Sequence, residues 1–123
     1  MRTIKTICPD FEEWSSRWMG IEEDLAYGNK VLEVIRPFVE SLVNSDMTDR
    51  KLKKYFDYLW LFGGEIIRDV SMNNEYDRSA IEVIKELIGP LGGPSCRHLH
   101  SDQEQDSYDK VCAELSEFLN NYS

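Results

Sequence analysis

The residues best suited to metal chemistry lie close together in one short stretch. Cys96, His98 and His100 fall within five residues, and the two histidines are the only ones in the chain. Thiolate and imidazole groups are ligands of tetrahedral Zn²⁺ sites. Such sites usually take ligands in pairs from two places. No second pair with a matching spacing is present, although Cys8 or Cys112 could complete a set. We therefore expect an ordinary loop, with no metal or other cofactor.

A second group of residues with possible chemistry is acidic. Glu65 and Asp69 are four residues apart on an expected helix, a spacing that suits a carboxylate pair with one raised pKa. Asp57 lies two turns earlier on a related face. A di-iron site of the bundle type needs Glu-x-x-His on paired helices, and neither histidine lies in an expected helix. We expect a solvated face in which Glu65 pairs with Arg68.

Nucleophilic catalysis lacks its usual signatures. The chain has no G-x-S-x-G elbow. Its loop GPLGGP lacks the lysine and the Ser/Thr of a phosphate-binding loop. No cysteine carries a nucleophile's signature, although Cys96 lies near His98. The sequence predicts a protein that is not an enzyme and has no catalytic residues.

The elements that position these residues are expected to be helices. The strongest pattern lies near 49–72, where Leu52, Leu59, Ile66 and Val70 follow one face and the stretch YLWLFGG is apolar nearly all round. Thr48 or Asp46 is the expected N-cap. We predict an all-α fold, with residues 1–123 forming a single-domain bundle of four to six helices around this central helix.

The remaining elements are predicted from hydrophobic periodicity and from the residues that interrupt or end it. Gly28 and Pro37 interrupt the pattern of 21–45, which predicts either two helices that break near Gly28–Asn29 or one bent helix. Residues 1–9 are expected to form a short strand or an ordered arm. Short helices are expected at 10–20 and 78–89, the latter with Ile81, Ile84, Leu87 and Ile88 inward, and a longer helix after the capping pair Ser101 and Glu104.

Two adjacent glycines stand inside the predicted central helix. Gly63 and Gly64 together cost about 2 kcal/mol relative to alanines. The favoured explanation is that another helix, carrying Trp14 or Trp18, packs closely against the bare backbone. The alternative is a ligand that occupies the gap.

Composition narrows the function classes. The 123 residues fit one domain. A formal net charge of −9 disfavours nucleic acid and anionic membrane as partners, and it permits rapid steering toward a basic protein. Three cysteines at wide spacing argue against a disulfide framework. No signal peptide or membrane span is visible, so we expect a cytoplasmic protein.

Acidic residues concentrate in two stretches. Residues 10–24 and residues 98–123 each carry six acids and one cation. If the two stretches meet in space, they form one strongly negative face with aromatic anchors. The start of the central helix, by contrast, carries four cations, Arg50, Lys51, Lys53 and Lys54, which either are balanced by neighbouring acids or mark a contact. The expected partner-binding residues are Trp14, Trp18, Glu22, Glu23, Asp24, Asp102, Glu104, Asp106 and Asp109.

The stretch YFDYLWLFGGEIIRDVSMNNEYDRSAIEVIKELI, in an acidic helical domain of this size, resembles small bacterial immunity proteins that guard a cell against its own secreted toxin. The resemblance implies stoichiometric binding of a toxin domain without a cofactor. The leading hypothesis is therefore an inhibitor that neutralises a basic toxin or nuclease. The alternative is a structural or regulatory helical subunit, either an adaptor or a homo-oligomer such as a homodimer.

Overall fold

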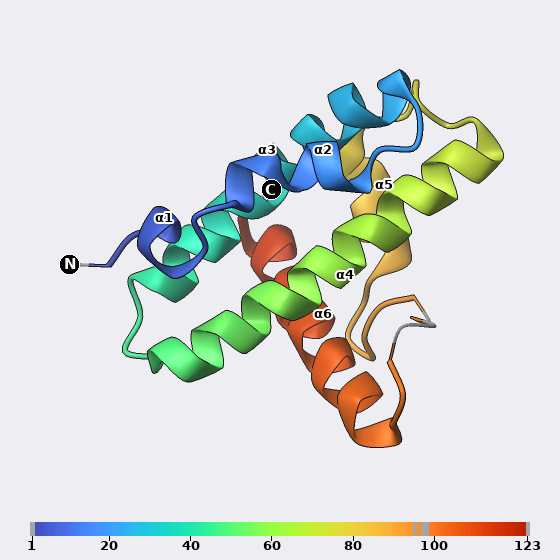
Figure 1. The fold of residues 1–123 in the computed structure, drawn as a ribbon. Coiled ribbons are helices and arrows are strands. Elements are labelled where there is room, and N and C mark those ends of the chain that lie inside the picture. The colour runs from blue at the N-terminus through green and yellow to red at the C-terminus, as the bar shows by residue number, and fades with distance from the viewer. Residues whose placement is uncertain (1, 95, 97–98, 123) are drawn as a thin grey trace.

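The structure is a computed structural model that describes residues 2–94, 96 and 99–122. Over these residues the fold is all-α, as predicted, and contains no strand. Figure 1 shows α4 crossing the molecule, with α2 and α3 along one side of it and α6 passing behind it. The helices are α1 (Ile4–Ile7), the 3₁₀ helix η1 (Phe11–Glu13), α2 (Trp14–Trp18), α3 (Glu22–Val43), α4 (Asp49–Asn73), α5 (Ala80–Leu87) and α6 (Asp102–Tyr122).

The predicted central helix is confirmed as α4. It begins after Thr48, whose Oγ1 accepts a hydrogen bond from the backbone N–H of Lys51 at 3.2 Å. It ends at Asn74, which adopts a left-handed conformation with φ of 52°. Asparagine tolerates this conformation better than most residues, so Asn74 is well suited to end the helix. α4 packs against α1, α2, α3, α5 and α6.

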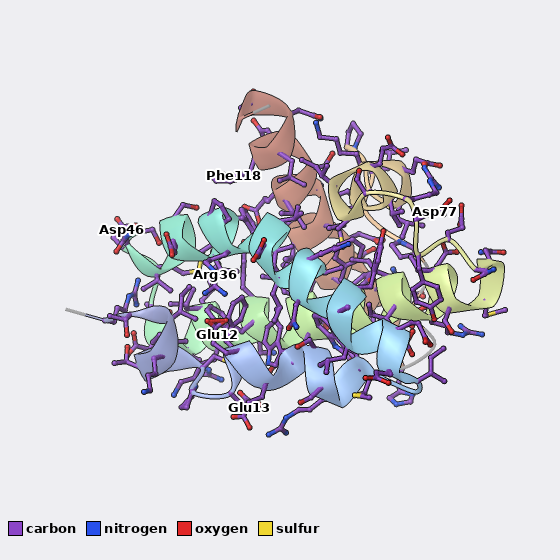
Figure 2. All side chains as sticks on the ribbon, turned by 90° about the horizontal axis from the view of Figure 1, so that it is seen from above. Glu12, Glu13, Arg36, Asp46, Asp77 and Phe118 are labelled. Atoms are coloured by element: carbon purple, nitrogen blue, oxygen red, sulfur yellow. The ribbon has the colours of Figure 1, made fainter. Side chains whose placement is uncertain are left out.

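α3 is one continuous helix, so of the two predicted alternatives the single helix is found and the break near Gly28–Asn29 is not (Figure 2). Gly28 lies under α2, where a Cβ on it would be 2.9 Å from the Cβ of Ser15. Ser15 also donates a hydrogen bond to the side-chain oxygen of Asn29 at 2.6 Å. Close packing against α2 therefore offsets the low helix propensity of glycine. Pro37 lies on the exposed side of the helix interior.

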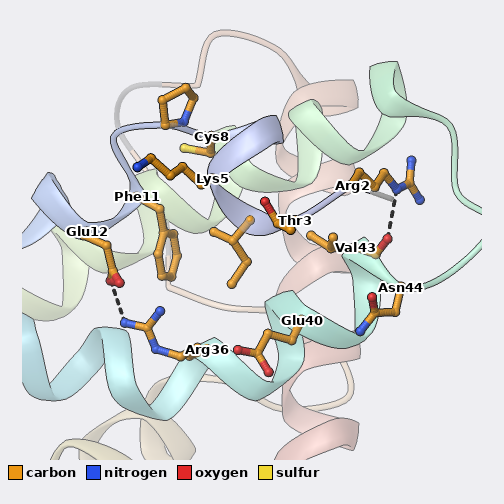
Figure 3. Close-up of a pocket in the computed structure, with 12 residues that line it drawn as sticks. Arg2, Thr3, Lys5, Cys8, Phe11, Glu12, Arg36, Glu40, Val43 and Asn44 are labelled. Atoms are coloured by element: carbon orange, nitrogen blue, oxygen red, sulfur yellow. Dashed lines mark hydrogen bonds and ion pairs between the residues drawn. The ribbon is translucent and has the colours of Figure 1, made fainter.

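The N-terminal segment forms a short helix in place of the strand that was one expectation. Thr3 and Thr6 cap it reciprocally, each hydroxyl accepting from the other residue's backbone N–H. Arg2 holds this segment across the α3–α4 turn, since its guanidinium donates to the carbonyls of Val43 and Ser45, both at 2.8 Å. Figure 3 shows the contact between Arg2 and Val43. An ordered arm, the other expectation, is what the chain forms.

The buried face of α5 differs at one position from the predicted inward face. Ile84 and Ile88 are buried as expected, but Ile81 is exposed and Val83 is buried in its place. The helix starts after Ser79, which caps it by accepting from the backbone N–H of Glu82 at 3.3 Å. The core-facing edge is therefore set by the 3.6-residue repeat counted from Ala80.

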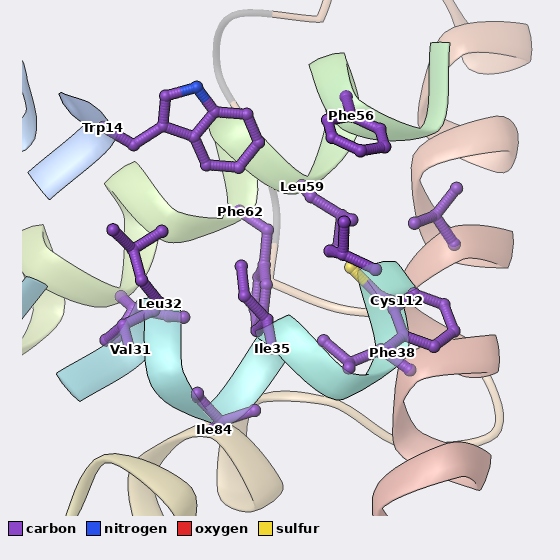
Figure 4. Packing of buried hydrophobic residues seen from close by; sticks show 14 of the residues in the cluster. Trp14, Val31, Leu32, Ile35, Phe38, Phe56, Leu59, Phe62, Ile84 and Cys112 are labelled. Atoms are coloured by element: carbon purple, nitrogen blue, oxygen red, sulfur yellow. The ribbon is translucent and has the colours of Figure 1, made fainter. Parts of the chain in front are cut away.

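α6 begins after Ser101, whose hydroxyl accepts from the backbone N–H of Glu104 at 3.1 Å, as its spacing predicts. Its C-terminal half meets that of α3, where the rings of Phe38 and Phe118 lie 5.4 Å apart. The buried side chains of all the longer helices join in one cluster, part of which Figure 4 shows around Leu59, Phe62 and Ile35.

Candidate functional site

Trp18 explains the double glycine. Its indole lies directly on Gly63, so that a Cβ added there would overlap the ring, whereas a Cβ added at Gly64 would lie at an ordinary 3.7 Å from it. The indole N–H donates to the carbonyl of Trp60 at 3.1 Å. Close packing of another helix is therefore confirmed, and the predicted alternative of a ligand in this gap is wrong because Trp18 fills it.

Two of the expected partner-binding residues lie inside the protein, which corrects the prediction that they face a partner. Trp14 is buried against Phe11 and Phe56, with ring centroids 4.8 and 6.2 Å away. Asp24 is buried as well. Helical spacing places Trp14 and Trp18 on one face, and that face points into the core.

Asp24 is a structural carboxylate. It accepts hydrogen bonds from the hydroxyl of Tyr76 at 2.6 Å and from the backbone N–H groups of Gly20 and Ile21 at 2.9 and 3.1 Å. Burial raises the pKa of Asp24, but these three donors stabilise the ionised form more strongly, so the pKa lies below its ordinary value. The residue ties the α2–α3 turn to the segment that follows α4.

The other acidic residues fall into two separate places. Glu22 and Glu23 are exposed in the first turn of α3, and Asp102, Glu104 and Asp106 are exposed at the start of α6. Figure 1 shows these helix starts at opposite ends of the view. The condition for a single acidic face, that the two stretches meet in space, is therefore not met at these helix starts. α3 and α6 cross through their C-terminal halves, and their N-terminal ends diverge.

Asp109 is half-buried, and its carboxylate is hydrogen-bonded to other residues of the chain. Its Oδ1 accepts from the backbone N–H of Gly93 at 3.3 Å and from the side chain of Gln105 at 3.0 Å. It also lies against Gly92, which has a φ of +127°. Asp109 therefore holds the 89–93 turn on α6.

Sequence reasoning missed a group of exposed apolar residues around the α2–α3 turn. Met19 is 38% exposed, Ile21 50% and Trp60 40%. Ile21 occupies the N-cap of α3 and makes no side-chain cap bond, although Ser, Thr, Asp or Asn is strongly preferred there. The sequence signal was present, because an apolar residue precedes three acids at a helix start. We call Trp18, Met19, Ile21, Glu22, Glu23 and Trp60 the α2–α3 surface.

The groups considered for metal and acid–base chemistry do not converge. His98 lies outside the described residues, Cys96 is buried and His100 is exposed. Among the residues that the structure describes, no three His, Cys, Asp or Glu side chains are placed to hold a metal ion. Glu65 lies 3.9 Å from Arg68, the expected pair, while Asp69 accepts from Asn73 at 3.4 Å.

No helix in the described part of the chain is long and apolar enough to cross a bilayer. Comparison with known proteins returned no matching family model, no matching curated protein and no matching solved structure.

Proposed function

We propose that this chain is a stoichiometric binding protein that captures a basic protein partner on the α2–α3 surface. The observation that carries the proposal is the position of Ile21, a half-exposed apolar side chain at a helix N-cap. A polar cap there would stabilise the helix by about 1 kcal/mol. A partner that buries Ile21 accounts for an apolar residue at a position where folding alone favours Ser or Asp.

The neighbouring residues favour a protein partner with positive charge. Glu22 and Glu23 follow Ile21 directly and are exposed, so they attract cations and suppress acidic competitors. The indole N–H of Trp18 donates to the backbone carbonyl of Trp60, and the partly exposed ring of Trp60 adds an aromatic group to this surface. Aromatic anchors that are surrounded by a polar rim are typical of binding hot spots.

The partner class that we favour is a basic toxin or nuclease, which the protein would neutralise in the manner of an immunity protein. This activity needs steering by opposite charge and a buried apolar anchor, with no cofactor. The proposal places the protein in the cytoplasm, where Cys8, Cys96 and Cys112 would stay reduced, in keeping with their free state.

The test is affinity capture from a lysate of the source organism with wild-type bait and with three matched variants. Ile21→Ser removes the anchor and adds a cap, the double variant Glu22→Gln/Glu23→Gln removes the charge, and Leu91→Ser removes an apolar side chain that is 95% exposed elsewhere. One basic protein should be retained by wild type and by Leu91→Ser, and lost from the other two variants. Its retention should weaken at high salt.

Two results would redirect the proposal. Capture of the chain by itself, as a dimer that Ile21→Ser dissociates, would favour the structural-subunit alternative. A basic partner that binds all four baits equally would remove the α2–α3 surface from consideration, and the acids at the start of α6 would then be the next surface to vary.

A further inference from the structure

A pocket of about 600 Å³ lies at the opposite end of α3, between α1, η1 and the last turns of α3 (Figure 3). Its accessible apolar wall comes from Ile4 and Pro9, while Phe11 and Val43 border the pocket as buried core residues. This volume falls in the range of small-molecule sites, which are mostly apolar and carry a few convergent polar groups. The α3 side of the pocket runs from Arg36 to Asn44, so the helix rise separates it from Ile21 by about 22–35 Å.

The end of the molecule that contains this pocket is neutral, although the chain is acidic. Residues 2–13 and 36–57 carry seven cations and seven acids, a net of 0, and the remaining residues carry a net of −9. Figure 1 shows these segments gathered where α3 turns into α4. The four cations at the start of α4 form no ion pair within the described part of the chain. Neighbouring acids therefore do not balance them by direct pairing.

Two cationic side chains, Arg36 and Lys5, line the pocket. The guanidinium carbon of Arg36 lies 5.4 Å from the centre of the Phe11 ring. Lys5 also lines the pocket and makes no ion pair with any described residue. An apolar body placed against Ile4 and Pro9 would therefore share the pocket with two positive charges.

Arg36 has hydrogen-bonding capacity left for a ligand. Its Nη2 donates to Oε1 of Glu12 at 2.5 Å. Its Nε and Nη1 donate to no other described residue. Guanidinium groups bind carboxylates through two parallel N–H donors. A ligand carboxylate can use the remaining donors, or it can displace Glu12, whose side chain is 65% exposed.

The pocket's own thiol takes no part in covalent capture. Cys8 donates to Oδ1 of Asp10 at 3.1 Å. Burial and the adjacent Asp10 raise the pKa of Cys8 to about 12, so the thiol stays protonated at neutral pH. Recognition in this pocket is therefore noncovalent.

We propose that this pocket binds a small amphipathic carboxylate, whose apolar body packs on Ile4 and Pro9 and whose carboxylate pairs with Arg36, while the charge of Lys5 in the same pocket adds attraction. Glu12 is the intramolecular competitor that occupies Arg36 when the ligand is absent. The inference is independent of the α2–α3 surface, which lies at the other end of α3.

The experiment measures binding of three probes with the same ring by titration calorimetry and by amide chemical shifts. The probes are 1-naphthoate, the neutral 1-naphthalenemethanol and the cationic 1-naphthylmethylamine. The carboxylate should bind most tightly and should shift amides of α1 and the end of α3. Lys5→Gln should weaken naphthoate binding about threefold, the effect of one exposed ion pair.

Glu12→Gln and Glu13→Gln form a matched pair of variants. Each raises the net charge by one unit, but Glu12 contacts Arg36 whereas Glu13 points away from it (Figure 2). Glu12→Gln should tighten naphthoate binding about threefold because it removes the competitor, and Glu13→Gln should leave the affinity nearly unchanged.

Three outcomes would overturn the proposal. Equal affinity for the neutral probe would show an apolar pocket without carboxylate recognition, and preference for the amine would assign recognition to Glu12 and Glu40. Equal tightening of naphthoate binding by the Glu12 and Glu13 variants would show that overall charge, and not the release of Arg36 from Glu12, causes the effect. Lys30→Gln, on the half of α3 remote from the pocket, controls for charge removal in the Lys5 variant.

Discussion

The indole of Trp18 occupies the space in which a side chain at Gly63 would begin, so α2 is seated directly on the backbone of α4. Any residue other than glycine at position 63 would block this contact between α2 and α4. Gly64, the next residue, has ordinary spacing to the same ring.

The adjacent glycines should therefore respond in opposite directions to alanine. Gly63→Ala should lower the free energy of unfolding by roughly 1–3 kcal/mol through overpacking. Gly64→Ala should be neutral or should raise it by up to about 1 kcal/mol through helix propensity. Urea denaturation measures both, and adding Trp18→Ala should abolish most of the cost at position 63. Equal effects at the two positions would contradict the packing described here.

Replacing the apolar N-cap should stabilise the fold. Ile21→Ser supplies a hydroxyl that can accept from the backbone N–H of Glu23, since that of Asp24 already donates to the carbonyl of Ile21 at 3.1 Å, and the free energy of unfolding should rise by about 1 kcal/mol. Leu91→Ser is the control, since Leu91 is exposed and caps no helix, and its effect should stay within about 0.5 kcal/mol. If Ile21→Ser destabilises the protein, Ile21 contributes to the fold, and its exposure is no sign of a binding role.

Asp24 should impose a pH dependence on stability. Its pKa is lowered in the folded state, so its contribution is complete above the ordinary pKa of an aspartate and is lost as pH falls through the lowered value. Asp24→Asn should cost roughly 1–3 kcal/mol at pH 7, because it weakens three charge-assisted hydrogen bonds. Unfolding measured from pH 7 down to pH 2 should show this difference shrinking with acidity.

Glu23→Gln, which changes an exposed neighbour, is the matched control and should show little difference at either pH. Tyr76→Phe should act in the same direction as Asp24→Asn, since it removes the hydroxyl that donates to the carboxylate. A cost for Asp24→Asn that stays constant across the pH range would show that side-chain packing, and not the ionised form, is the source of the stabilisation.

The thiols of Cys8 and Cys112 should react slowly with iodoacetamide at pH 8. Burial raises both pKa values to about 12, with Asp10 adding to the effect at Cys8 and Asp109 at Cys112. Asp10→Asn should lower the pKa of Cys8 and speed its alkylation several-fold, as read by peptide mass spectrometry. Asp77→Asn, at the other end of the molecule, should leave the rate unchanged. If the Asp10 and Asp77 variants react at equal rates, access and not charge limits the thiol.

Local signals were sufficient for the starts of α4 and α6. Thr48 and Ser101 cap α4 and α6 as their spacing predicts, because a side-chain cap involves only residues within one turn. The central position of α4 also followed from its nearly continuous apolar surface. These features depend on neighbours in the chain, which a sequence displays directly.

The candidate site depended on contacts between distant segments, and its prediction was less successful. Asp24 lies in an acidic run, and only the approach of Tyr76, 52 residues later, makes it a buried carboxylate. The pairing of Glu12 with Arg36, across 24 residues, likewise requires that η1 lie on α3. Periodicity specifies which side chains share a helix face, but the packing of distant helices decides which face is covered.

The charge difference between the two ends of α3 gives the molecule a permanent electric dipole. On a positively charged resin the protein should adsorb through its acidic portion, which leaves the Phe11 pocket open to solution and covers part of the acid-rich surface. Attachment through the lysines of the α4 start would reverse this orientation. The chemistry used to fix the protein to a sensor chip thus determines which of its two ends remains available to a ligand.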